Sequence, residues 1–279
     1  MFQYAAARAV SIERNVPLQL DVSDFEKYTL HNGFELERIF HLTDMSDGQV
    51  SLRCHDHGLY GRRLRRLFAR EGLSRLRPKK LIYEPHFEYW DGIRDVADDC
   101  YLTGYWQSEK YFTRQAEIIR RDFAFKTEMS TVNCSYVEQI NAFNAVSLHI
   151  RRGDYVSNPT TLAVHGICSL DYYQKAIEFI AAHIDDPFFF IFSDDIEWVR
   201  KNVPLKFPHA YVDHNTGAES YNDMRLMSLC KHHVIANSSF SWWGAWLGCN
   251  PNKVVIAPKR WFRNDNNTSD LIPDSWIRL

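Results

Sequence analysis

The second half of the chain alternates between short apolar runs and longer stretches with helical spacing. Within residues 170–184 the apolar side chains recur at i, i+3, i+4 and i+7, and residues 221–232 follow a similar pattern. The short apolar runs cover residues 146–150, 188–192, 233–236 and 254–257. Because strands that alternate with helices form right-handed βαβ units, this half predicts a parallel, doubly wound sheet.

The first half of the chain has a regular pattern only at its beginning. Residues 1–15 carry alanine and apolar residues at helical spacing, and residues 16–22 alternate as a strand does. This helix begins at residue 1, so it has neither an N-cap nor a preceding strand to pack on. Residues 30–135 mix helical patterns with loops, including an aromatic segment at 101–112, and they predict no single arrangement.

Polar residues follow three of the predicted strands at the point where each strand ends. The first strand leads into Arg151, Arg152, Gly153 and Asp154, the second into Ser193, Asp194 and Asp195, and the third into Asn237, Ser238 and Ser239. In a parallel sheet these ends lie along one edge, so we expect the three groups to share a crevice. An aromatic helix at residues 240–248 follows the third group, and core packing is expected for two of its three tryptophans, Trp242, Trp243 and Trp246.

The residue types in this crevice are typical of a diphosphate site. Arginine matches phosphate bidentately, Gly153 allows close backbone approach, and a helix that starts at serine offers free amide groups to an anion. The first alternative is a structural ion-pair cluster of Arg151, Arg152 and Asp154. A weaker one is an adhesive Arg-Gly-Asp loop. No Gly-x-Gly-x-x-Gly fingerprint follows a strand, so a nicotinamide or flavin dinucleotide is not indicated.

Composition narrows the class of protein. The chain has 279 residues, of which 45% are hydrophobic and 24% charged, and its net charge of −2 argues against nucleic acid as the main partner. No apolar run approaches the length of about 20 residues that spans a membrane, and no charged leader with an apolar core opens the chain. The six cysteines are scattered, as expected for reduced thiols, and together these features favour a cytoplasmic protein.

Two local segments stand apart from this average. Residues 61–80 hold nine basic residues and one acidic residue, and Leu64, Leu67 and Phe68 share a helical face. This pattern fits a peripheral contact with the inner face of the membrane, or an ordinary surface helix that packs its apolar side chains inward. Residues 54–57 (Cys-His-Asp-His) contain metal-ligand types, but no second cluster completes a zinc pattern, and a surface loop is favoured.

Several of these motifs together resemble a known family. The segments "HIRRGDY", "FFIFSDD" and "DMRLMSLCKHHVIANSSFSWWGAWLG" have the order and spacing found in the bacterial α-1,2-fucosyltransferases of glycosyltransferase family 11, and "YLTGYWQSEKYF" looks like that family's segment too. The first motif is also similar to that of the α-1,6- and protein O-fucosyltransferases. The resemblance implies a GT-B fold of two Rossmann-like domains, expected at residues 1–138 on the acceptor side and 139–279 on the GDP-fucose side.

The resemblance also implies a reaction. It predicts an inverting transfer of L-fucose from GDP-L-fucose to the 2-hydroxyl of a terminal β-galactoside, in the synthesis of a surface polysaccharide or another glycan. No metal or other cofactor is expected, and the chain contains no Asp-x-Asp triplet of the kind that metal-dependent glycosyltransferases use.

Roles follow position by position from the matching motifs. Arg151 is expected to neutralise the leaving β-phosphate, and Asp223 to contact the nucleoside. Asp154 is the candidate general base for the acceptor hydroxyl, with orientation of the arginines as the alternative role. The remaining residues expected to bind the nucleotide and its phosphates are His149, Arg152, Asn237, Ser238 and Ser239.

The resemblance has one departure, at the beginning of the chain. The family has a strand and a Gly-Gly-Leu-Gly-Asn-Gln loop immediately before "MFQYA", so we expect the N-terminal domain of this chain to lack both. A longer chain with both features is expected to be more stable and more active. The competing functions are a non-catalytic nucleotide-sugar-binding remnant, and an RNA-binding or membrane-surface protein that uses residues 61–80.

Overall fold

The chain forms two compact α/β units. The computed structural model describes residues 1–27, 33–42, 50–53, 65, 67–69, 71–153, 156, 158–264 and 266–279. Unit 1 comprises Met1–Lys126 with Ser269–Leu271, and unit 2 comprises Thr127–Thr268 with Ile272–Leu279. The domain boundary expected between residues 138 and 139 falls inside helix α5 (Thr131–Ala142), which belongs to unit 2 because its Ile140 is buried beside Leu226 of that unit.

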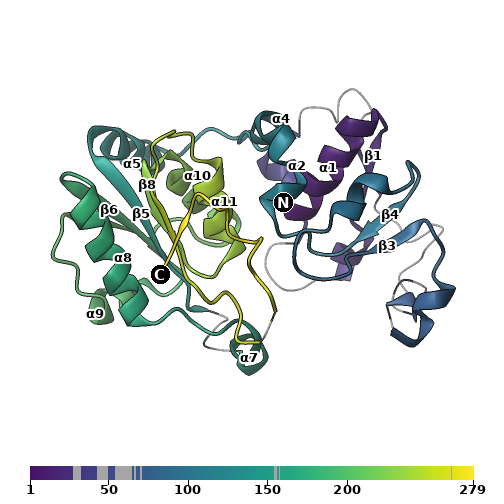
Figure 1. The fold of residues 1–279 in the computed structure, drawn as a ribbon. Coiled ribbons are helices and arrows are strands. Elements are labelled where there is room, and N and C mark those ends of the chain that lie inside the picture. Colours follow the sequence, from purple (N-terminus) through teal and green to yellow (C-terminus); the bar gives the residue numbers. More distant parts are fainter. Residues whose placement is uncertain are drawn as a thin grey trace. The chain divides into compact units, whose positions relative to one another are not determined.

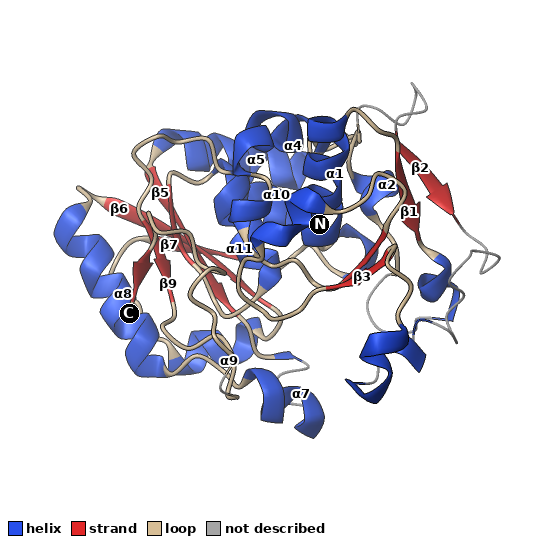
Figure 2. Ribbon diagram, turned by 45° about the vertical axis from the view of Figure 1, so that its right-hand side comes forward, coloured by secondary structure: helices blue, strands red, loops and turns tan. Residues whose placement is uncertain are grey.

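The described part of unit 2 is built on a six-stranded parallel sheet with strand order β10-β9-β8-β5-β6-β7 (Figures 1 and 2). The chain runs outward through three strands, then returns to the other side of the first and runs outward again. This is the strand order of dinucleotide-binding folds. The strands are β5 (Asn144–Ile150), β6 (Pro187–Ser193), β7 (His209–Val212), β8 (His232–Val234), β9 (Val255–Ala257) and β10 (Ile277–Arg278). The predicted parallel sheet is therefore confirmed, with β7 and β10 as strands that the pattern did not predict.

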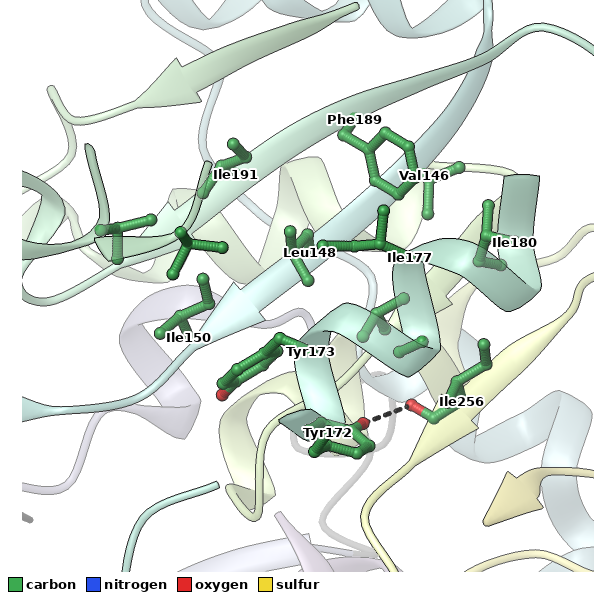
Figure 3. Packing of buried hydrophobic residues seen from close by; sticks show 14 residues of the cluster. Val146, Leu148, Ile150, Tyr172, Tyr173, Ile177, Ile180, Phe189, Ile191 and Ile256 are labelled. Atoms are coloured by element: carbon green, nitrogen blue, oxygen red, sulfur yellow. Dashed lines mark hydrogen bonds between the residues drawn. The ribbon is translucent and has the colours of Figure 1, made fainter. Parts of the chain in front are cut away.

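Helices cover both faces of this sheet (Figure 2). On one face, α8 packs Ile177 and Ile180 against Val146 and Leu148 of β5, as Figure 3 shows. On the other face, α5 and α10 cover Phe190 of β6. Because β5 and β6 are buried on both faces, their sequences are near-continuous apolar runs. The helices of this unit are α5, α7 (Pro159–His165), α8 (Leu170–His183), α9 (Ile196–Asn202), α10 (Tyr221–Leu229) and α11 (Ser239–Leu247), with a 3-10 turn, η6 (Gly217–Glu219).

The aromatic helix α11 is part of the core. Its tryptophans Trp242, Trp243 and Trp246 are all buried, so the expectation that one of them is not a core residue is wrong. Trp242 and Trp246 lie nearly parallel, at 9° and with 6.2 Å between ring centroids, because residues four apart share a helical face. Trp276 packs on Trp242 from the last strand region, at 5.4 Å between ring centroids.

Unit 1 contains two parallel strand pairs, β1–β2 and β3–β4. The predicted first helix and strand are confirmed as α1 (Phe2–Arg14) and β1 (Leu18–Asp21). Asp122 joins α1 to α4 in the interior, where it accepts hydrogen bonds from the Tyr4 hydroxyl (2.7 Å) and Arg8 Nε (3.3 Å). The other elements are α2 (Leu36–Ile39), β2 (Val50–Arg53), β3 (Leu81–Tyr83), β4 (Tyr101–Thr103) and α4 (Ala116–Asp122), with 3-10 turns η1 (Ser23–Lys27), η2 (Glu71–Leu76), η3 (Asp91–Asp95), η4 (Glu109–Tyr111) and η5 (Thr113–Gln115).

Two predicted segments of unit 1 fall largely or wholly on residues without a description. The Cys-His-Asp-His segment at 54–57 lies outside the described residues, as do residues 61–64, 66 and 70 of the basic segment. In the described part of the latter, Leu67 is exposed, and Arg65 pairs with Asp21 at 2.8 Å.

Candidate active site

The strand order of unit 2 reverses at one position, between β5 and β8. The connection after β5 leads toward one edge of the sheet, and the connection after β8 leads toward the other edge. Such a reversal is a topological switch point, and ligands of open α/β sheets bind there, outside the carboxyl ends of the strands. Arg151 follows β5, and Ser238 follows β8 directly before α11. Asp194 follows β6, the other neighbour of β5. The three strand ends that the sequence predicted to meet therefore belong to adjacent strands.

A single carboxylate, that of Asp194, organises the turn after β5. Its Oδ2 lies 2.8 Å from Arg151 Nη1, and its Oδ1 accepts a hydrogen bond of 2.8 Å from the Arg152 amide. A Cβ on Gly153 would collide with this carboxylate, so only glycine fits there without displacing it. The side chains of Arg151 and Asp194 remain 23% and 25% exposed, so the pair is accessible from solvent at the crevice.

The side chain of Arg152 contacts Asp195 and Trp198. Its Nε lies 3.2 Å from Asp195 Oδ2, and its guanidinium carbon lies 3.5 Å from the centroid of the Trp198 ring. Asp195 also caps α9 by accepting a hydrogen bond from the Trp198 amide. Both arginines are thus paired with consecutive aspartates. The contribution of Trp198 was not predicted, since no local pattern connects a tryptophan in α9 to an arginine after β5.

His149 lies at the boundary between β5 and α11. The side chain is 95% buried, its ring centroid is 5.9 Å from that of Phe240 in α11, and its Nδ1 has no hydrogen-bond partner among the described residues. Burial, aided by the charge of Arg151, lowers the pKa of His149 to about 3. The imidazole is therefore neutral at physiological pH.

The start of α11 provides amide groups at the same strand ends. Ser238 occupies the N-cap position, but its side chain makes no capping hydrogen bond, and Ser239 is exposed at the first helical residue. The amides of the first turn of a helix have no intrahelical acceptor and carry the positive end of the helix dipole. This end of α11 thus has the features of an anion site next to His149.

Asn237 is bonded to the protein at both ends of its side-chain amide. Its Nδ2 donates to the carbonyl oxygens of His165 (2.9 Å), Gly166 (3.4 Å) and Trp261 (3.1 Å). Its Oδ1 accepts from the Cys168 thiol at 3.4 Å. These bonds hold the segments around Gly166 and Trp261 close to the start of α11, and the expected contact of Asn237 with the nucleotide stays a prediction.

Asp223 lies in the first turn of α10, beside the loop that follows β7. Its Oδ1 accepts a hydrogen bond of 2.9 Å from Asn215, which is in turn bonded to Asn133 of α5. Burial raises the pKa of Asp223 to about 7, although the Asn215 hydrogen bond opposes the shift. A carboxyl group with this pKa is a hydrogen-bonding group whose charge changes near neutrality. Asn133 and Asn215 were not predicted, because the network joins three separate elements.

Three further observations concern the candidate base, metal ligands and membrane-spanning helices. Asp154 lies outside the described residues, so the structure says nothing of its surroundings. No three His, Cys, Asp or Glu side chains gather as metal ligands in the part of the chain that is described. No helix among the described ranges is long and apolar enough to cross a bilayer.

The fold is of the GT-B type. The fucosyltransferase NodZ from Bradyrhizobium has a similar fold, with a TM-score of 0.50 and 15% sequence identity over 88% of this chain and 86% of that one. Residues 95–279 match the family model of glycosyl transferase family 11. The chain belongs to this family.

Relatives with known names cover different shares of the chain. An α-1,2-colitosyltransferase from Escherichia coli is 36% identical over 285 aligned residues, which span 100% of this chain and 94% of that protein. The O-antigen biosynthesis glycosyltransferase WbnK of Escherichia coli is 47% identical over 137 residues, 49% of this chain and 45% of that protein. The galactoside 2-α-L-fucosyltransferase SEC1 of Bos taurus is 31% identical over 103 residues, 37% of this chain and 28% of that protein.

Proposed function

We propose that this glycosyltransferase moves L-fucose from GDP-L-fucose to the 2-hydroxyl of a terminal β-galactoside, with inversion at the sugar carbon. The observation that carries the proposal is that β5 and β8 are adjacent strands at the switch point of the sheet, with Arg151 after β5 and the uncapped start of α11 after β8. These groups suit a nucleoside diphosphate, because an arginine fork and free helix amides both bind phosphate oxygens.

A second candidate is the transfer of colitose in the same α-1,2 linkage. It is favoured by the identity to an α-1,2-colitosyltransferase over the whole length of this chain. The two candidates differ only in the sugar of the donor, so they share the roles that follow.

In this proposal the charge on the leaving diphosphate is stabilised by the protein. Arg151 contacts the β-phosphate, and the first-turn amides of α11, beginning at Ser239, contact the same group. Negative charge that develops as the sugar bond breaks is therefore stabilised by preorganised donors. Neutral His149 offers Nδ1 as a hydrogen-bonding group for the nucleotide. Asp223 accepts hydrogen bonds from the base, whose ring N–H groups match a carboxylate.

Inversion also requires a base on the face opposite the leaving group, and we propose Asp154 for this role. This role is supported over the alternative of orienting the arginines by the pairing of Asp194 with Arg151 and of Asp195 with Arg152. A proton from the acceptor hydroxyl would pass to Asp154 as that oxygen bonds to the sugar carbon and GDP leaves.

The test of this function is a transfer assay with two donors. The protein is incubated with lactose and either GDP-L-fucose or GDP-colitose, while free GDP is measured and the product linkage is determined by NMR. We expect acceptor-dependent GDP release and an α-1,2-linked product with GDP-L-fucose. Faster transfer from GDP-colitose would favour the second candidate. Donor binding without acceptor-dependent transfer would instead identify a non-catalytic remnant.

Transfer is expected to need no divalent metal. The reason is that Arg151 and the start of α11 supply the positive charge that a metal provides in other glycosyltransferases. The rate should be unchanged after incubation with excess EDTA, with a metal-dependent glycosyltransferase as the control for effective chelation. A loss of activity that magnesium or manganese restores would contradict the phosphate role of Arg151.

Donor affinity is expected to fall as the pH drops below about 7, because Asp223 has a pKa of about 7 and must be ionised to accept two hydrogen bonds from the base. The effect on folding has the opposite sign. The folded pKa lies above the ordinary value of 3.8, so the contribution of this group to stability is full below 3.8 and is lost as the pH rises through about 7.

The measurement is the donor KM between pH 6 and 8 for the wild type and for Asp223→Asn. The asparagine variant keeps an oxygen for the Asn215 hydrogen bond but does not titrate. We expect its donor KM to be raised and independent of pH. A wild-type KM that does not change over this range would remove Asp223 from the nucleotide site.

A further inference from the structure

Unit 1 contains a tight turn, Gly104 to Trp106, directly after β4. Its middle residue, Tyr105, has 67% of its surface exposed, and it is the aromatic side chain with the largest exposed fraction among the described residues. Trp106, by contrast, is buried. Single exposed apolar side chains are common on protein surfaces, so exposure by itself assigns no role to Tyr105. The backbone of the turn provides the second observation.

The turn has a backbone conformation that side chains rarely adopt. Trp106 has φ = 55°, in the left-handed region, which is unfavourable for a large residue. A Cβ on Gly104 would lie 2.5 Å from Glu84 Cβ and 2.8 Å from Glu84 Oε2, so this position accepts only glycine without rearrangement. Strained backbone of this kind persists only where the surroundings hold it, and it is concentrated at functional sites.

Three separate parts of unit 1 hold the turn in place. The carboxylate of Glu84, just after β3, accepts hydrogen bonds from the amides of Tyr105 (2.7 Å) and Trp106 (3.0 Å). Gln3 of α1 donates to the Gly104 carbonyl at 2.7 Å. The Trp106 ring meets the Tyr111 ring edge-on, with 5.4 Å between centroids. The ring of Tyr105 is therefore displayed from a rigid base.

This turn lies where the α/β architecture places ligands. β3 and β4 are parallel and adjacent (Figure 1), and the segments after both contain aromatic residues. The segment after β3 includes Tyr89 and Trp90, and the Trp90 amide donates to the Tyr111 hydroxyl at 3.0 Å. Ligands of open α/β sheets bind beyond the carboxyl ends of the strands. Tyr105 thus projects from a packed aromatic layer at the ligand-binding edge of its strand pair.

We infer that Tyr105 is the stacking platform for the galactose ring of the acceptor. One face of β-galactose presents contiguous C–H groups, and an aromatic ring packs against such an apolar face. A tyrosine on a rigid turn loses little conformational freedom when a sugar binds, and its hydroxyl can reach the polar rim of the sugar. This inference rests on the proposed function, because it assumes that the acceptor is a β-galactoside.

The test compares Tyr105→Ala and Tyr105→Phe with a matched control, Leu76→Ala. Leu76 is 69% exposed on the same unit, but it ends η2, ahead of the amino end of β3. For each protein the KM for lactose and the KM for GDP-L-fucose are measured. Binding of lactose is followed separately by saturation-transfer NMR, and folding by thermal melts.

We expect Tyr105→Ala to raise the lactose KM by about tenfold, with the donor KM and the melting temperature unchanged. Tyr105→Phe should stay near the wild type because it keeps the ring, and Leu76→Ala should change neither KM. In the NMR experiment the galactose C–H protons should receive the strongest saturation in the wild type and lose it in Tyr105→Ala.

Failure of the inference and failure of the proposed function give different results. If the wild type transfers sugar and Tyr105→Ala has the wild-type lactose KM, the role assigned to Tyr105 is wrong and the proposed function is unaffected. If the wild type transfers no sugar, the proposed function fails, and the NMR experiment decides the inference alone. Lactose contact that depends on Tyr105 would then support it, and contact that is absent or unchanged in Tyr105→Ala would overturn it.

Discussion

Arg151→Ala is expected to abolish sugar transfer and to weaken GDP-L-fucose binding by about 2 to 5 kcal/mol, the usual cost of truncating one partner of a buried charge pair. Arg151 lies at the switch point, where its Nη1 is 2.8 Å from Asp194 Oδ2. Without the guanidinium, the charge on the diphosphate is no longer compensated in a partly buried site. The loss should be larger for turnover than for binding, because charge on the leaving group increases in the transition state.

Two variants make this experiment specific. Arg151→Lys should also fail, because a point charge does not replace a bidentate fork. Arg14→Ala is the matched control: Arg14 has a similar exposure of 28% and pairs with Asp98 at 2.7 Å, but it ends α1 in unit 1. It should leave donor affinity unchanged. Wild-type donor affinity in either Arg151 variant would rule out the assignment, whatever the effect on turnover.

Trp242→Ala is expected to lower the free energy of unfolding of unit 2 by about 3 to 5 kcal/mol, the range for truncating a buried aromatic residue. Trp242 is 0% exposed and contacts three other indole rings, those of Trp243, Trp246 and Trp276. Removing it leaves a cavity between α11 and the end of the chain. Because α11 also supplies the proposed anion site, donor affinity should fall together with stability.

Urea unfolding followed by far-ultraviolet circular dichroism measures this effect without relying on tryptophan fluorescence. Trp242→Phe keeps an aromatic ring and should lose less stability. Phe143→Ala is the control for an exposed aromatic residue, since Phe143 stacks on Phe188 at the surface, with 4.5 Å between centroids. An unfolding midpoint for Trp242→Ala equal to that of the wild type would show that α11 does not depend on its tryptophan cluster.

The two units differ in how far their structure follows from sequence patterns. The helix predicted at 170–184 is observed at Leu170–His183, and the one predicted at 221–232 at Tyr221–Leu229. Long amphipathic helices and strands buried on both faces repeat a local signal over many residues. In unit 1, β3 and β4 have three residues each, and much of the rest is 3-10 turn. Strands of three residues are too short to show the two-residue alternation of a strand clearly, so no strand was predicted at either position.

The sequence by itself determined the parallel sheet of unit 2 and the placement of charged residues at its strand ends, because both follow from periodicity and from the order of residues along the chain. Only the tertiary structure decided which side chain or backbone group each of these residues contacts. Arg151 pairs with Asp194, Arg152 lies over Trp198, and the amide of Asn237 donates to the His165 carbonyl. These choices depend on which strands become neighbours, and strand order is set by packing between residues that are far apart in the sequence.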